Sequence, residues 1–133
     1  MANQDFTNAL EELVLDWAFT AGSPTRPTAW YIGLFSVLPT ADDGTGGTEL
    51  TGAGGYGRQS VTFTRTGQTM NPSAVVTFGP ATGTDWAEAV GFGIFSADTE
   101  GTLYAFKALT TPRTVQVGDS ATFAPSALSI TID

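Results

Sequence analysis

The spacing of hydrophobic residues near the start of the chain is that of a helix. Five apolar residues recur along one stripe: Phe6, Leu10, Leu13, Val14 and Trp17. The acidic residues between them fall outside this stripe, as on an amphipathic helix. We expect Asn3 or Asp5 to cap the start, and the glycine and proline of AGSP (residues 21–24) to end it. This helix is expected either to pack on its own domain or to dock on a neighbouring subunit.

After residue 27 the pattern changes to short β segments. The segment TAWYIGLFS, residues 28–36, is apolar on both alternating faces, which is typical of a central strand. Further candidate strands follow: RQSVTFTR, SAVVTFG, AVGFGIFS, GTLYAFKAL, RTVQV, SATFA and ALSITID. Most of them are separated by residues expected to form turns, such as TGQTMNP at 66–72. Because no helix falls among them, the pattern predicts an all-β fold, an antiparallel β-sandwich or jelly roll with one N-terminal α-helix.

The length of 133 residues fits a single domain covering 1–133. Within it we expect a helix or arm at 1–20 and the β-sandwich at 28–133. The side chains expected between two sheets come from most of the candidate strands: Trp30, Ile32, Leu34, Phe63, Phe78, Phe92, Ile94, Tyr104, Phe106, Phe123, Leu128 and Ile130.

The charges of the chain are few and mostly acidic, with a net charge of −8. The basic residues are scattered along the sequence: Arg26, Arg58, Arg65, Lys107 and Arg113. Nucleic-acid binding draws mainly on lysine and arginine that neutralise phosphates, so we expect no nucleic-acid partner. The start lacks the positive charge of a signal peptide, and no apolar run approaches membrane-spanning length. We therefore expect no membrane association.

The chain contains no cysteine and no histidine. This removes thiolate nucleophiles, the usual transition-metal ligands and the commonest general base. Asp85 and Glu88 flank Trp86 and form the cluster that most suggests a paired-carboxylate hydrolase, but a turn anchored by the tryptophan is favoured. The sequence predicts a non-enzymatic protein with no catalytic, cofactor-binding or metal-binding residues.

Residues 41–59, ADDGTGGTELTGAGGYGRQ, are rich in glycine. A phosphate loop would need a lysine after its glycines and a helix beyond them, whereas a strand is expected here. Asp42, Asp43 and Glu49 have the oxygen ligands that calcium prefers, although the spacing of an EF-hand is absent. The favoured interpretation is a surface loop that packs or contacts a partner and enters a strand through Tyr56 and Arg58.

Several motifs stand in order along the chain: NALEELVLDWAF, WYIGLFSVLPTADDGTGGTEL, GYGRQSVTF and AVGFGIFSADTEGTLYAF. Their sharpest elements are GTE at 47–49, GYGRQ at 55–59 and GIFS at 93–96. With these motifs the chain resembles, over nearly its whole length, a family of small bacteriophage virion structural proteins that are often labelled tail-fibre proteins. Gly57 stands where alanine is common in that family.

The resemblance implies a virion component assembled in the cytoplasm of the host bacterium, without indicating head or tail. Because a compact sandwich leaves no room for a fibre shaft, we expect a capsid decoration (cement) protein that bridges capsomers. A small tail, baseplate or fibre-associated protein is the alternative, and a receptor- or glycan-binding module is a further one.

The expected partners are other copies of the chain, in a homotrimer, and the major capsid protein or other virion proteins. The residues expected at such interfaces lie on the helix and in the glycine-rich stretch: Phe6, Leu10, Leu13, Trp17, Asp42, Asp43, Glu49, Tyr56 and Arg58.

Overall fold

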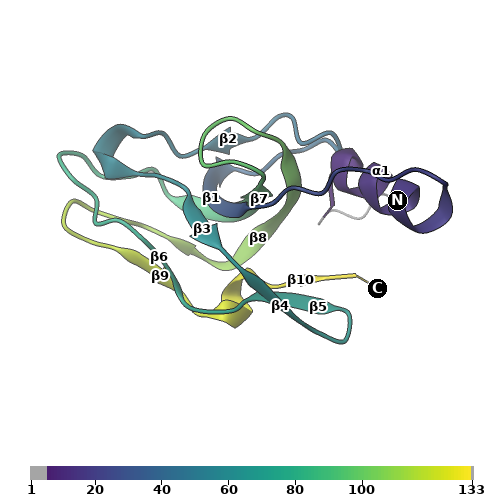
Figure 1. Ribbon diagram of the computed structural model, residues 1–133. Helices are drawn as coiled ribbons and strands as arrows, with labels where there is room; N and C mark the ends of the chain where they lie inside the picture. The colour runs from purple at the N-terminus through teal and green to yellow at the C-terminus, as the bar shows by residue number, and fades with distance from the viewer. Residues whose placement is uncertain (1–5, 133) are drawn as a thin grey trace.

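The computed structural model describes residues 6–132, which form antiparallel sheets and one α-helix (Figure 1). The helix α1 spans Asn8–Phe19. The strands, in chain order, are β1 (Trp30–Val37), β2 (Thr48–Glu49), β3 (Gln59–Val61), β4 (Phe63–Thr66), β5 (Thr69–Pro72), β6 (Val76–Phe78), β7 (Ala89–Phe95), β8 (Leu103–Arg113), β9 (Ala121–Phe123) and β10 (Ile130–Thr131). Two short 3-10 helices are η1 (Ala53–Gly55) and η2 (Pro125–Leu128). The predicted all-β fold with one N-terminal helix is confirmed.

The base of α1 is attached to strand β8. Thr7 occupies the N-cap position, but its hydroxyl makes no capping bond and donates instead to two carbonyl oxygens of β8, at 2.7 and 3.1 Å. Phe6 forms an isolated antiparallel bridge with the same strand. Asn3 and Asp5, the expected caps, lie outside the described residues. From this base the helix extends away from the sheets (Figure 1), and no helix within residues 6–132 is long and apolar enough to cross a membrane.

The largest sheet has five strands, in the order β2-β1-β7-β8, with β3 also paired to β1. As expected for a central strand, β1 has partners on both edges. Ile32 lies opposite Ile94 and Leu34 opposite Phe92 in the β1–β7 ladder, so these four side chains share one face of the sheet. All four are buried and belong to the hydrophobic core.

Two smaller sheets complete the core. One has the order β10-β5-β4, and the other is the pair β6-β9. Phe78 of β6, Phe123 of β9 and Ile130 of β10 are nearly inaccessible and belong to the same apolar cluster as the large sheet. The smaller sheets therefore pack on one face of the large sheet, which gives the molecule a sandwich-like architecture (Figure 1).

Most of the expected core residues are buried, nine of the twelve. Phe106 is buried, but it pairs with Gly93 and so lies on the face of the large sheet opposite to Ile94 and the main core. Trp30, Phe63 and Tyr104 are only half-buried, because they line a groove between the helix and the sheets. The alternation along a strand predicts which residues share a face, but it does not predict what covers that face.

Two expected elements are wrong. The segment RTVQV is not a separate strand, because β8 continues to Arg113 and the next residues form a loop with one bridge at Val117. The segment TGQTMNP was expected to be a turn, yet only its beginning turns, and its remainder is strand β5, which pairs with both β4 and β10. In addition, the single expected strand RQSVTFTR is divided at Thr62 into β3 and β4, which belong to different sheets.

Candidate functional site

Arg58 and Glu49 form a bidentate ion pair on the face of the large sheet opposite to the main core. We call this the second face of the sheet. The Nε and Nη2 atoms of Arg58 donate to the two carboxylate oxygens of Glu49, both at 2.8 Å. The two side chains are 9% and 23% exposed, respectively. The guanidinium also lies over the ring of Phe95, with its carbon 3.5 Å from the ring centroid. This combination of parallel charged hydrogen bonds and ring stacking is available to arginine and not to lysine.

The remaining donors of Arg58 fix the turn between β7 and β8. Its Nη1 atom donates to the carbonyl oxygens of Ala97 at 2.8 Å and Glu100 at 2.7 Å. Glu100 has a φ of 54°, which is uncommon for a residue with a side chain, and Gly101 follows with a φ of 72°. Arg58 therefore stabilises a turn in which Glu100 has an unfavourable backbone conformation.

Tyr56 joins the ion pair to strand β1. Its hydroxyl accepts the backbone N–H of Leu34 at 2.8 Å and donates to Glu49 Oε1 at 3.0 Å. Its ring is parallel to that of Phe78, with centroids 6.2 Å apart, and meets the ring of Trp86 edge-on at 5.5 Å. Burial raises the pKa of Tyr56 above its ordinary value, because the phenolate would be poorly solvated there.

Gly33 makes room for this cluster. It lies directly opposite Gly93 in the β1–β7 ladder. A Cβ atom built on Gly33 would lie 2.6 Å from Glu49 Oε1 and 2.9 Å from a ring carbon of Phe95. Because these approaches are closer than carbon atoms tolerate, the carboxylate reaches its position only over a glycine. We call Glu49, Tyr56, Arg58 and Phe95 the ion-pair cluster.

The ion-pair cluster joins the three motifs on which the resemblance depends. Glu49 comes from GTE, Tyr56 and Arg58 come from GYGRQ, and Phe95 comes from GIFS. Their polar groups bind one another and the backbone of the same chain. The interface role expected of Glu49, Tyr56 and Arg58 stays a prediction, while their contacts within the subunit are structural.

The two neighbouring acids of the glycine-rich stretch point into solvent. Asp43 accepts the hydroxyl of Thr45 at 2.6 Å and its backbone N–H at 2.9 Å, and these bonds lower the pKa of the Asp43 carboxyl. The backbone carbonyl of Asp42 accepts the N–H of Asn8 at 2.8 Å, which ties the loop to the start of α1. Because Glu49 turns inward to Arg58, the three acids do not converge, and residues 6–132 contain no group of three or more acidic, histidine or cysteine side chains placed to hold a metal.

Asp85 and Glu88 make structural hydrogen bonds. The carboxylate of Asp85 accepts the backbone N–H of Val117 at 2.8 Å, and that of Glu88 accepts the hydroxyl of Thr114 at 3.5 Å. Trp86 between them is 6% exposed, and its indole N–H donates to Gly54 at 2.8 Å. The favoured interpretation of this segment, a turn anchored by its tryptophan, agrees with the structure.

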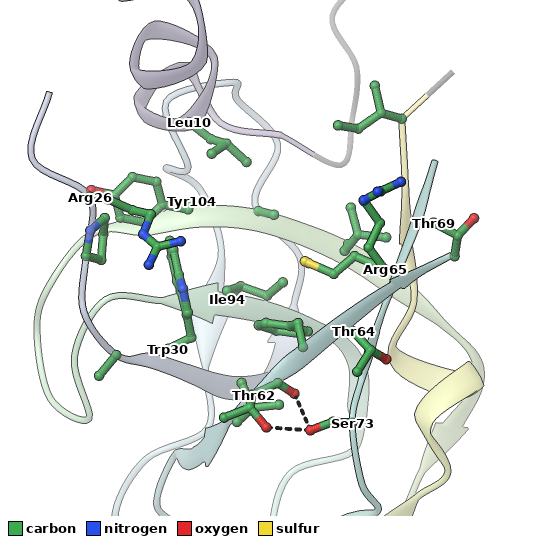
Figure 2. A pocket seen from close by; sticks show the side chains of 18 of the residues that line it. Leu10, Arg26, Trp30, Thr62, Thr64, Arg65, Thr69, Ser73, Ile94 and Tyr104 are labelled. Carbon is green, nitrogen blue, oxygen red and sulfur yellow. Dashed lines mark hydrogen bonds between the residues drawn. The ribbon is translucent and has the colours of Figure 1, made fainter. Parts of the chain in front are cut away.

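An apolar groove of about 1130 Å³ separates α1 from the β4–β5 hairpin. Figure 2 shows Leu10 of the helix on one side and Ile94 and Trp30 on the floor. The ring of Tyr104 meets that of Trp30 edge-on, with centroids 5.3 Å apart. Arg26 and Arg65 lie on opposite sides of this groove (Figure 2). The sequence did not predict the groove, because its lining comes from segments far apart in the chain.

The apolar stripe of α1 is covered only in part. Phe6 and Leu10 are half-buried and pack against the hydrophobic core, and Leu13 is half-buried as well. Val14 is 40% exposed and Trp17 is 74% exposed. No residue of α1 is fully buried. The base of the helix therefore packs on its own domain, as in the first of the two expected roles. The end of the helix remains uncovered within the subunit.

The chain matches the model of a known protein family. No curated protein matches the chain at a significant level. A family model described as "Podophage GP4 fiber I protein gp80" matches residues 5–131, which is nearly the whole chain and includes the ion-pair cluster, α1 and all of the groove lining except Ile132. The predicted resemblance to bacteriophage virion structural proteins is thereby confirmed, and the chain belongs to the podophage GP4 fiber I protein gp80 family.

Proposed function

We propose that the chain is a non-enzymatic structural subunit of the fibre apparatus of a bacteriophage virion. The observation that carries this proposal is the family match over residues 5–131, whose description names a fibre protein. The geometry supports it, because a rigid β body with a helix that extends from one side is suited to contacts between protein subunits. The subunit is assembled into particles in the cytoplasm of the host bacterium.

Capsid decoration is the second candidate, and the sequence favoured it. The small sandwich-like body and the scarcity of charge are also suited to a protein that binds many equivalent places on a capsid. The description of the family names a fibre and not a capsid, and this makes the fibre the first choice. In either place we propose that the chain works as a homotrimer, and that its partners are copies of itself and other virion proteins, with no nucleic acid and no membrane.

The proposal that the protein is not an enzyme rests on what its candidate acids do. Asp85, Glu88 and Glu49 each accept hydrogen bonds from groups of their own chain. We expect purified protein to leave no cleared band in gels that contain peptidoglycan or capsular polysaccharide. A cleared band that disappears in an Asp85→Asn variant would show that the carboxylate has a catalytic role.

The copy number per particle separates the two structural candidates. Quantitative mass spectrometry of purified particles, with the portal and major capsid proteins as internal references, gives this number. A fibre subunit is expected in a small multiple of the tail's symmetry, whereas a decoration protein is expected in hundreds of copies. Absence of the protein from purified particles would contradict both.

A further inference from the structure

The end of α1 carries a second apolar surface that faces away from the subunit. Leu15 and Phe19 are one helical turn apart and therefore lie on the same side of the helix. Leu15 is 54% exposed and Phe19 is 81% exposed. This side is not the one that carries Leu10 and Leu13, which are half-buried. A pair of large apolar side chains held in water by a helix is typical of a contact surface.

Acidic residues lie beside this apolar pair. Glu12 and Asp16 are exposed along one side of it, and Glu11, half-buried in the first turn of the helix, lies one turn before Leu15. Helix α1 carries no basic residue in its last turn. The end of the helix thus presents an apolar centre with a negative border.

The groove has the opposite arrangement. Its floor and walls are mainly apolar, and an arginine stands on each side, Arg26 before β1 and Arg65 on β4 (Figure 2). Neither arginine forms an ion pair with another residue of the described part of the chain. The side chain of Arg65 donates only to the carbonyl oxygen of Gly67 in its own hairpin, at 2.5 Å. Exposed Val75 and Ile132 extend the apolar lining to the outer edge of the groove.

We propose that the groove of one copy receives the end of α1 from a second copy. Leu15 and Phe19 enter the groove, and the acids beside them lie against Arg26 and Arg65. This inference rests on the proposed function, because it supplies the contact by which the fibre subunits assemble. The charge pattern selects this occupant, since an acidic border on the helix matches a basic border on the groove.

The size of the contact is consistent with a specific interface. Large aromatic side chains bury about 150–250 Å² each, so Phe19 covers roughly a quarter of the ~800 Å² that one partner contributes to a standard interface. Leu15, the stems of the acidic side chains and the rim of the groove supply further area. Because helix and groove are different surfaces, the contact is head-to-tail, and in the proposed homotrimer three such contacts form a closed ring.

Sedimentation velocity on the full chain tests the contact. We expect Leu15→Ser and Phe19→Ser to raise the dissociation constant by roughly 10- to 100-fold, because exposed apolar anchors are removed while the fold is untouched. Val75→Ser, at the rim of the groove, is expected to weaken association in the same direction. Val37→Ser is the matched control, since Val37 is 50% exposed and Val75 57% exposed, but Val37 does not line the groove.

Disulfide trapping identifies the two surfaces directly. The natural chain has no cysteine, so introduced thiols have no competitor. Ala18→Cys, which keeps Leu15 and Phe19 in place, and Thr64→Cys proteins are prepared separately and then mixed under mild oxidation. We expect a cross-linked pair in the mixture, and little cross-linking of either protein alone.

Two outcomes would overturn the proposal. One is a chain that stays monomeric at millimolar concentration, and the other is an assembly in which Ala18→Cys cross-links to itself and not to Thr64→Cys. These results are independent of the proposed function, which the copy number in particles tests. A protein that is present in the virion but assembles without the helix end would overturn this contact alone.

Discussion

The guanidinium of Arg58 makes two parallel hydrogen bonds, each of 2.8 Å, to the carboxylate of Glu49. This pair brings together the segments GTE and GYGRQ and, through Phe95, the segment GIFS. The motifs on which the sequence resemblance rests therefore meet at one place on the second face of the large sheet. Their shared role is to fix the glycine-rich stretch and the β7–β8 turn on that face.

Arg58→Lys is expected to lower the free energy of unfolding by about 2–4 kcal/mol. A lysine keeps the charge but loses the parallel hydrogen bonds to Glu49, the ring contact with Phe95 and the bonds to the turn. Urea denaturation measures the loss. Arg65→Lys is the control, because Arg65 is exposed and its side chain donates only to Gly67. Equal stability of both variants would contradict a structural role of the ion-pair cluster.

Tyr56→Phe is expected to lower the free energy of unfolding by about 1–3 kcal/mol near neutral pH. The substitution removes one hydroxyl, and it leaves the buried N–H of Leu34 without its acceptor. Thermal or urea unfolding of the two proteins gives the difference directly. Stability equal to that of the natural chain would show that another group satisfies this N–H.

The raised pKa of the Tyr56 hydroxyl predicts that the folded chain loses stability at high pH. The pKa of this hydroxyl is raised by burial above the ordinary 10.0, so above pH 10 the unfolded chain releases a proton that the folded chain keeps. The stability that Tyr56 contributes is therefore complete below pH 10 and falls above it by about 1.4 kcal/mol per pH unit. In urea titrations between pH 8 and pH 11, the advantage of the natural chain over Tyr56→Phe is expected to shrink only above pH 10. A constant difference would contradict this assignment.

Two glycine substitutions are expected to have opposite results. Gly33→Ala places a methyl group 2.6 Å from Glu49 Oε1, so we expect a loss of about 1–3 kcal/mol. Gly57→Ala meets no atom within 4 Å and lies outside the positive-φ region. It is expected to be neutral or to stabilise the chain by up to about 1 kcal/mol through the unfolded state. Calorimetric unfolding of the two variants compares them, and similar losses in both would rule out a steric role specific to Gly33.

Phe123→Ala is expected to lower the free energy of unfolding by about 3–5 kcal/mol. The Phe123 ring is fully buried and meets the Phe78 ring edge-on at 5.9 Å, so the truncation removes burial and leaves a cavity. Phe63→Ala, in the half-buried lining of the groove, is expected to cost clearly less. If the two variants lost the same amount, the groove would be as tightly packed as the core.

The sequence predicted the elements whose buried face follows from the spacing of their apolar residues. The helix and the strands containing Ile32, Phe92 and Phe123 follow from apolar spacing alone, because that spacing decides which face is buried. Strand β5 was missed because TGQTMNP has turn-forming residues, and only its pairing with β4 and β10 makes it extended. The segment RTVQV alternates like a strand, but beyond Arg113 its ladder contact is the isolated bridge between Val117 and Ala81.

The candidate site was predictable in its residues and not in its geometry. Glu49, Tyr56 and Arg58 stood out in the motifs, but sequence does not show that a carboxylate nine positions away is the partner of Arg58. The carboxylate of Glu49 fits over Gly33, and strand pairing across the sheet determines where Gly33 lies. The groove could not be predicted from the sequence for the same reason, since Trp30, Tyr104 and Arg65 come together only in the folded chain.

The central claim is that this chain is a structural part of the virion's fibre apparatus. Immunogold electron microscopy of purified particles, with antibodies raised against the folded chain, tests it most directly. Gold confined to the tail and its fibres is the result that the account predicts. Gold spread evenly over the head would contradict it and would assign the protein to capsid decoration.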